Sequence, residues 1–490
     1  MMDVDGDENS RFTEGTAKFI TWFESLPGTT FHKDIAIEDL RDTNAGRGII
    51  AKADIEADAV LFTIPRNAII CGATTSLKDR IPAIFDLDKY DDSDEDGSSS
   101  QDSWTLLILV MMYEYLQGDA SMWKPYLDVL PVAFDTPMFW SPAELSELQA
   151  SAVLGKIGKE EADEMIRSKI LSVINTYQHI FFLRGQALNE SQLLELAHRM
   201  GSAIMAYAFD LDKDDGDEAD EEDEWIEDKE GRTMLGMVPM ADMLNADAEF
   251  NAHINHGEGA LTATALRPIK AGEEILNYYG PLPNGELLRR YGYVTRKHSR
   301  YDVVELPWEL VEQQLKERVG IHMSSADWDK AKQLADAELD EEFEEAFVLE
   351  RSSEDPDSSG QLHSDATFEG LPEELGEQVK VFLKAVKKTG NIEAQALSDK
   401  DTRKEVYLQA VLGALEARER QYATSLEQDR QILFDCYRMT RKNKAVWVRR
   451  GEKEVLKDAQ AWVRRELGEL QTRTAGSRGE DAPAAKKRRL

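Results

Sequence analysis

The feature that most constrains the fold is an alternation between two kinds of hydrophobic pattern along the chain. Residues 46–72, 234–244 and 260–280 contain short runs of apolar and β-branched residues separated by polar turns, which is typical of strands. Residues 104–209 repeat apolar residues at helical spacing, and that spacing dominates again from about residue 305. The sequence therefore predicts an α+β protein in which a β domain is interrupted by a helical insertion and followed by an all-helical domain.

A chain of 490 residues is longer than one ordinary domain, so we expect several structural units. The first is a helix in which Phe19, Trp22 and Phe23 can share a face. The expected units are an N-terminal helix in 1–30, the β domain in 31–300 with the insertion at about 104–209 and an acidic loop at 210–231, a helical domain in 301–466, and a disordered basic tail in 467–490.

The net charge of −36 limits the classes of partner. Nonspecific nucleic-acid binding depends on Lys and Arg neutralising phosphates, so a basic protein is the better expected partner. The alternative is that the acidic charge only keeps the chain soluble. No run approaches the roughly 18 apolar residues of a membrane span, and the acidic start lacks the regions of a signal peptide. The KKRRL cluster at 486–490 favours the nucleus, with the cytoplasm as a second location.

Several catalytic signatures are missing from the sequence, namely the phosphate-binding Gly-rich loop, the Gly-x-Ser-x-Gly elbow and the His-Glu-x-x-His helix. His253 and His256 have no cysteine nearby, so we interpret them as surface residues and expect no metal site. Cys71 and Cys436 are too few and too distant for a disulfide framework, which fits a reducing compartment.

Three segments stand out together. In AGRGIIA, at 45–51, two glycines flank an arginine ahead of a strand and allow close backbone approach. In MVPMADMLNADAEFN, at 237–251, Asp242, Asn245 and Asn251 stand in a polar turn, and an asparagine can both donate and accept hydrogen bonds. In GEEILNYYGPLPNGELLRRYGYV, at 272–294, two tyrosines end a strand before a glycine.

In this order, the three segments resemble the SET domain of protein lysine methyltransferases. In that family a Gly-rich turn, an Asn-His segment and a Tyr-Gly segment meet around S-adenosylmethionine, and the last two form a pseudoknot. The split domain and the helical C-terminal part resemble, over residues 15 to 465, the subgroup related to the Rubisco large-subunit methyltransferase. The segments MAYAF at 205–209 and SMWKPYLDVLP at 121–131 are most similar to fungal members that act on a large-subunit ribosomal protein.

The resemblance implies roles for individual residues. Tyr279 matches the catalytic tyrosine beside the target lysine, and Trp123 and Asp210 are expected to contact the substrate. The expected contacts of S-adenosylmethionine are Ala45, Gly46, Arg47, Tyr207, Asn245, Ala246 and Tyr279. The implied function is monomethylation of a lysine in a large-subunit ribosomal protein by a monomer that binds neither nucleic acid nor membrane directly.

One departure from the family pattern leaves alternatives open. Ala246 replaces the usual histidine after the asparagine, although the main-chain N–H and C=O of that position survive any side-chain change. The chain could instead be an inactive SET-type module that binds lysine tails, or an acidic chaperone for basic proteins. Within the enzyme hypothesis, a histone or another nuclear protein is the alternative substrate.

Overall fold

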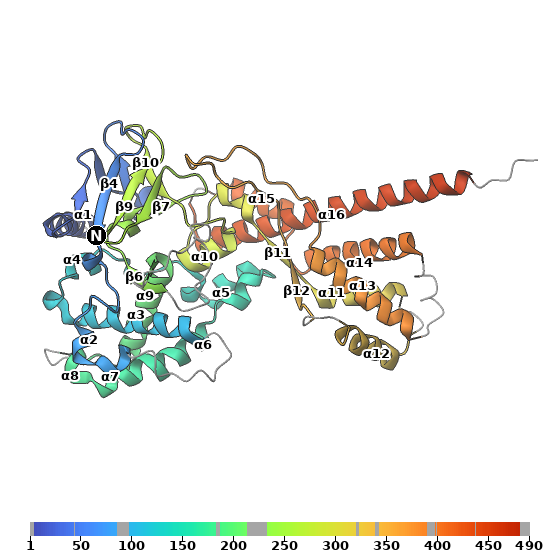
Figure 1. The fold of residues 1–490 in the computed structure, drawn as a ribbon, viewed down its shortest axis with the longest axis horizontal. Helices are drawn as coiled ribbons and strands as arrows, with labels where there is room; N and C mark the ends of the chain where they lie inside the picture. Colours follow the sequence, from blue (N-terminus) through green and yellow to red (C-terminus); the bar gives the residue numbers. More distant parts are fainter. Residues whose placement is uncertain are drawn as a thin grey trace, which may run out of the picture.

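The computed structural model describes residues 4–43, 45–85, 98–182, 187–212, 233–319, 323–338, 343–389, 397, 399–436 and 438–480. Figure 1 shows the strands β1 to β10 and the helical insertion gathered at one end of an elongated molecule, and the C-terminal helices with β11 and β12 toward the other. The long helix α16 (Arg441–Glu480) begins beside the first end and runs past the C-terminal helices. The predicted order of a split β domain and a helical domain is confirmed.

The β domain consists of two four-stranded sheets. The first has the order β1 (Thr30–Phe31), β4 (Val60–Pro65), β9 (Ala260–Ala265) and β8 (Ala252–His256). The second has the order β2 (Ile35–Asp39), β3 (Arg47–Ala51), β10 (Glu274–Asn277) and β7 (Asn245–Ala246). Burial alternates along β9, where Leu261, Ala263 and Ala265 face the core, because successive side chains of a strand point to opposite faces.

Strands from the two halves of the sequence meet in the second sheet. β10 pairs antiparallel with β3, with Ile275 opposite Ile49, and parallel with β7, with Leu276 opposite Asn245. Residues more than two hundred positions apart thus become neighbours. The second and third predicted segments lie side by side, as the expected pseudoknot requires.

Helices cover this β domain. α1 (Val4–Ser25) packs Phe19 and Phe23 into the core with both side chains fully buried, and Trp22 contacts Phe19, so the predicted shared face is confirmed. The insertion contains α3 (Ser98–Gln117), α4 (Lys124–Leu127), α5 (Pro142–Leu145), α6 (Lys159–Met165), α7 (Ser172–Thr176), α8 (Gln178–Phe181) and α9 (Glu190–Tyr207), after the short α2 (Leu77–Arg80). The helical insertion therefore begins at least six residues earlier than predicted.

The expected acidic loop is shorter at its start than the sequence suggested. Residues 208–212 form β5 (Ala208–Asp212), which pairs antiparallel with β6 (Thr233–Met237). Residues 213–231 of the expected acidic loop lie outside the described residues. Asp210 is thus a strand residue, opposite Leu235, and not a loop residue. Pairing with β6 satisfies the backbone N–H and C=O groups of β5, which the sequence pattern alone does not reveal.

The C-terminal domain is helical. It contains α11 (Trp308–Val319), α12 (Ser325–Asp336), α13 (Glu373–Lys388), α14 (Lys400–Arg420), α15 (Leu426–Phe434) and most of α16, and it follows α10 (Asn284–Tyr291). Trp308, Trp328 and Phe382 form edge-to-face contacts in its core. Within the described part of the chain, no helix is long and apolar enough to cross a membrane.

Two features of this domain differ from the sequence prediction. β11 (Val304–Pro307) pairs with β12 (Ala346–Leu349), so the domain also holds a two-stranded sheet. α16 continues to Glu480 and buries Leu470, whereas we expected disorder from residue 467. Leu467 and Leu470 extend the apolar spacing of the helix, which explains why it does not end there. The KKRRL cluster lies outside the described residues.

Charged groups join α16 to the helical insertion. Asp135 accepts hydrogen bonds from Arg441, at 2.6 Å, and from Lys444. Farther along the helix, Ser151 donates to Glu452 at 2.5 Å. These contacts fix the C-terminal domain against the domain that contains the three predicted segments.

Candidate active site

Asn245 joins the three predicted segments. Its side-chain amide donates to the carbonyl of Arg47 at 3.2 Å and to Oε1 of Glu274 at 2.7 Å. The side chain can approach because Gly48 has none: a Cβ there would lie 2.9 Å from Nδ2 of Asn245 and 2.8 Å from Oε1 of Glu274. The close approach that we expected from glycine in this turn is confirmed at Gly48.

Asn251 fixes the strand that carries the third segment. Its amide donates to the carbonyl of Glu274 at 2.9 Å, and its carbonyl oxygen accepts from the N–H of Leu276 at 2.8 Å. The side chain is buried, so these bonds also satisfy its polar atoms. Asn251 therefore sets the position of β10, which leads directly to Tyr279.

Tyr279 follows β10 and lies beside the asparagine turn. Its hydroxyl donates to the carbonyl of Leu244 at 3.2 Å, and its ring stacks on Tyr291 with centroids 4.8 Å apart. Burial raises the pKa of Tyr279 well above its ordinary value, and the neighbouring Tyr293 and Tyr291 add to the effect. The hydroxyl is therefore neutral at physiological pH, so it acts as a hydrogen-bonding group and not as a base.

A buried carboxylate lies in the turn before Asn245. Asp242 accepts from the hydroxyl of Tyr126 at 2.8 Å, and its other oxygen is buried without a hydrogen-bond donor among the described residues. Burial raises the pKa of Asp242 to about 7, although Tyr126 and nearby backbone N–H groups favour the ionised form. This group interacts electrostatically with both Tyr207 and Tyr279.

The predicted residues of the Gly-rich turn have different surroundings. The Arg47 guanidinium donates to the carbonyls of Val129 at 2.9 Å and Phe12 at 3.2 Å, so its side chain anchors α1. Gly46 is open, since a Cβ there would meet no heavy atom of the described residues within 4 Å. The space beside Gly46 is thus open to a ligand, although the N–H of Ala45 and the carbonyl of Gly46 are bonded to the main chain of Leu40, and the Arg47 side chain is already bound to protein.

Tyr207 and Ala246 lie on two further sides of this region. Tyr207 ends α9, is partly buried, and has a pKa raised by burial and by Asp242. Ala246 is 8% exposed, and its carbonyl accepts from the hydroxyl of Tyr293 at 3.4 Å. The hydroxyl of Tyr293 therefore already takes up the carbonyl of Ala246. Their predicted contacts with a cofactor stay predictions.

The two expected substrate residues lie in different environments. Trp123 is 2% exposed and its indole N–H donates to the carbonyl of Ala68 at 2.8 Å, which makes it a core residue in this structure. Asp210 is exposed on β5. Its position permits a substrate contact, while Trp123 has neither exposed surface nor an unpaired polar atom to offer. The substrate contact of Trp123 stays a prediction that would require the side chain to move.

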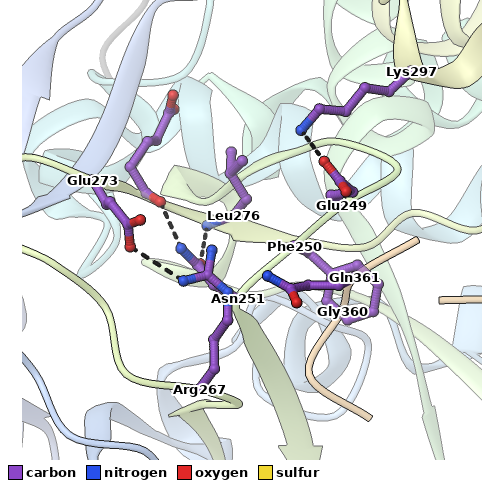
Figure 2. Close-up of a pocket in the computed structure, with 10 residues that line it drawn as sticks. Glu249, Phe250, Asn251, Arg267, Glu273, Leu276, Lys297, Gly360 and Gln361 are labelled. Atoms are coloured by element: carbon purple, nitrogen blue, oxygen red, sulfur yellow. Dashed lines mark hydrogen bonds and ion pairs between the residues drawn. The ribbon is translucent and has the colours of Figure 1, made fainter. Parts of the chain in front are cut away.

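A polar cavity of about 230 Å³ lies behind the asparagine turn. Figure 2 shows Asn251 and Arg267 directed toward the Glu273 and Leu276 segment, and Lys297 toward Glu249. Both cations of the cavity are paired with carboxylates, Arg267 with Glu273 at 3.3 Å and Lys297 with Glu249 at 2.8 Å. The lining therefore has no uncompensated cation that would select an anionic ligand.

The sequence analysis did not identify three of the five tyrosines that lie around this site. Tyr126, Tyr291 and Tyr293 join Tyr207 and Tyr279 through the contacts above, and we call these five side chains the tyrosine cluster. The segment RRYGYV could have suggested Tyr291 and Tyr293, because one tyrosine ends an amphipathic helix and the other follows it closely. No pattern singled out Tyr126.

The two sheets, the paired asparagine and tyrosine segments and the tyrosine cluster define a domain of the SET type. Residues 46–280 match the SET domain family, and residues 328–456 match the Rubisco LSMT substrate-binding family. The chain therefore contains a SET domain and a Rubisco LSMT substrate-binding domain.

Two curated relatives of this chain are named as lysine methyltransferases. Ribosomal lysine N-methyltransferase 4 of Saccharomyces cerevisiae is 34% identical over 315 residues, which cover 62% of this chain and 60% of that protein. Human N-lysine methyltransferase SETD6 is 31% identical, over 51% of this chain and 49% of that protein. The matched region thus spans only half to three fifths of these relatives.

Solved structures agree over a greater length. The SET domain of LSMT bound to lysine and AdoHcy is similar to this chain with a TM-score of 0.62, over 94% of this chain and 93% of that one. Rubisco LSMT bound to AdoMet has a TM-score of 0.60. The sequence identity of both is 19%, so these likenesses concern the fold.

Proposed function

We propose that this chain is an S-adenosylmethionine-dependent protein-lysine N-methyltransferase. The observation that carries the proposal is the Tyr279 hydroxyl, held by the Leu244 carbonyl one residue before Asn245, inside a SET domain. The names of the yeast and human relatives and the AdoMet-bound neighbour support the same activity.

The residues present fit the cofactor. Gly46 leaves open space beside its main chain, and Asn245 holds the neighbouring turn in place through two hydrogen bonds. Ala45, Gly46, Tyr207, Asn245 and Ala246 would hold S-adenosylmethionine through the tyrosine ring and through main-chain atoms other than the N–H of Ala45 and the carbonyls of Gly46 and Ala246, which are bonded within the protein. When bound, this cofactor supplies a methyl group on a positively charged sulfur.

The role of the protein is then to present a neutral lysine amine in one orientation. The Tyr279 hydroxyl donates to Leu244, so its oxygen can accept an N–H bond from the amine and direct the nitrogen lone pair. A lysine has a pKa near 10.4 in water, and entry into the aromatic surroundings lowers it by desolvation. Alignment of two reactants can supply roughly 7 to 11 kcal/mol in favourable systems, which makes positioning the largest contribution.

We further propose a basic substrate, specifically a large-subunit ribosomal protein. The net charge of −36 favours encounter with a Lys- and Arg-rich partner, and the yeast relative is named for ribosomal lysine methylation. We propose monomethylation from the resemblance to the fungal members of the family. A monomeric state, and a nuclear location based on residues 486–490, belong to the same proposal.

The test is incubation of the purified chain with methyl-labelled S-adenosylmethionine and, separately, intact ribosomes, ribosomal proteins and histones. We expect one labelled large-subunit protein, with a single methyl group located on one lysine by mass spectrometry. Labelled histone without labelled ribosomal protein would contradict the ribosomal substrate. Cofactor binding without any labelled protein would favour a substrate outside this set, and absence of both would favour the lysine-tail binding module.

A further inference from the structure

Asp242 is a partly buried ionisable residue of the candidate site to which the mechanism above assigns no role. It lies in the turn Ala241–Met243, directly before the Leu244 carbonyl that holds Tyr279. Oδ2 accepts from Tyr126 at 2.8 Å, while Oδ1 is buried without a donor among the described residues. Such an unsatisfied oxygen in a folded core calls for a physical explanation.

The backbone of this turn is also unusual. Met240 is fully buried and has a φ of 84°, in the left-handed region that residues other than glycine rarely adopt. Such strain persists only where the surrounding structure enforces it, and it gathers at functional sites. The strained residue lies two positions before Asp242, whose carboxylate accepts the hydrogen bond of Tyr126.

The titratable and charged groups around this carboxylate come from four parts of the fold. Tyr126 of α4, Tyr207 of α9 and Tyr279 after β10 are neutral when buried, and each interacts electrostatically with Asp242. Arg47 of β3 interacts at longer range and favours the ionised carboxylate. When Asp242 is ionised, Tyr126, Tyr207 and Tyr279 therefore lie around a negative charge, one of whose oxygens has no hydrogen-bond donor among the described residues.

We propose that Asp242 is a positioning residue whose negative charge makes this site prefer a cationic ligand, and so favours the sulfonium cofactor over its neutral thioether product. The inference rests on the proposed function. S-adenosylmethionine and S-adenosylhomocysteine share the adenosine and amino-acid groups and differ in the charged methyl-sulfonium. The ratio of their dissociation constants therefore isolates the electrostatic effect from packing.

The test is isothermal titration calorimetry of both ligands on the full chain, as wild type and as Asp242→Asn. Unit charges several ångströms apart in protein change affinity by roughly tenfold or more, so the preference for S-adenosylmethionine is expected to fall roughly tenfold in Asp242→Asn. Burial raises the pKa of Asp242 to about 7, so the wild-type preference should increase as pH rises through neutrality, while the variant stays flat.

Two further variants complete the design. Asp302→Asn removes another buried carboxylate whose pKa burial raises to about 7, but that group bonds to Asn284 and does not face the tyrosine cluster, so the ratio should stay at the wild-type value. Tyr126→Phe removes the hydrogen bond that favours the ionised carboxylate, so the pH-dependent rise should move to higher pH. This variant also tests the inference if Asp242→Asn does not fold.

The outcomes separate the two proposals. Equal weakening of both ligands in Asp242→Asn, or a pH curve that Tyr126→Phe does not move, would overturn the role of Asp242 and leave the proposed function in place. Failure of the wild-type chain to bind either ligand would overturn the proposed function and this inference with it.

Discussion

Gly48 lies where the three predicted segments converge, and its replacement by alanine tests how closely they pack. The new Cβ would stand 2.3 Å from Cδ1 of Leu40, 2.8 Å from Oε1 of Glu274 and 2.9 Å from Nδ2 of Asn245. The end of Leu40 can rotate away. The side chains of Asn245 and Glu274 are hydrogen-bonded to each other, so neither can move away from the new Cβ without weakening that hydrogen bond.

Overpacking of a core usually costs about 1 to 3 kcal/mol, and the disturbed bond places Gly48→Ala at the upper end, about 3 kcal/mol. For a domain of this size, a loss of 1 kcal/mol lowers Tm by roughly 2 to 4 °C, so the expected decrease is roughly 6 to 12 °C. Thermal unfolding followed by circular dichroism measures it.

Gly46→Ala is the matched control in the same turn. A Cβ at Gly46 meets no heavy atom of the described residues within 4 Å, so Tm should change by no more than about 1 °C. Binding of S-adenosylhomocysteine should nevertheless weaken about tenfold if the cofactor lies against this main chain. A wild-type Tm for Gly48→Ala, or equal destabilisation by both variants, would refute the packing argument.

Three further predictions concern other parts of the molecule. Tyr279→Phe should lower kcat at least about tenfold with little change in cofactor affinity, because it removes the hydroxyl but keeps the ring on Tyr291; full turnover would contradict the mechanism. Asp429→Asn should destabilise the chain by about 3 to 5 kcal/mol in chemical denaturation, because Lys453 stays buried without its carboxylate; a loss below about 1 kcal/mol would argue against this. Burial raises the pKa of Glu452 to about 7, so the folded state binds a proton more tightly than the unfolded state, and the free energy of unfolding should fall by up to about 3 kcal/mol between pH 4.5 and 7. Glu452→Gln should remove that part of the pH dependence, and parallel curves for the two proteins would disprove the assignment.

Local pattern was sufficient for much of the fold. Helical spacing identified α1 with Phe19 and Phe23 inward, and short apolar runs predicted the strands within residues 46–72, 234–244 and 260–280. These predictions succeed because side-chain direction follows the period of the local backbone. β12 escaped prediction, since its four residues acquire their partner only when β11 lies beside them.

The candidate site could be predicted in part from the sequence. The order of the motifs singled out Asn245 and Tyr279, whose roles stay predictions, and the structure brings their segments together with the Gly-rich turn. It assigns Trp123 to the core, however, and the Arg47 guanidinium to α1. Neither assignment follows from residue type, because both side chains have polar groups that could equally have faced a ligand.

The sequence by itself determined where strands and helices form, which residues turn the chain, and the charge of the whole molecule. Only the tertiary structure decided that Asp242 lies among tyrosines from separate elements and that Glu452 of α16 is buried against Ser151 of the insertion and Tyr422. The physical reason is that burial and desolvation depend on groups far apart along the chain. A carboxylate has the same intrinsic pKa everywhere in the sequence, and its surroundings in the folded protein determine what it does.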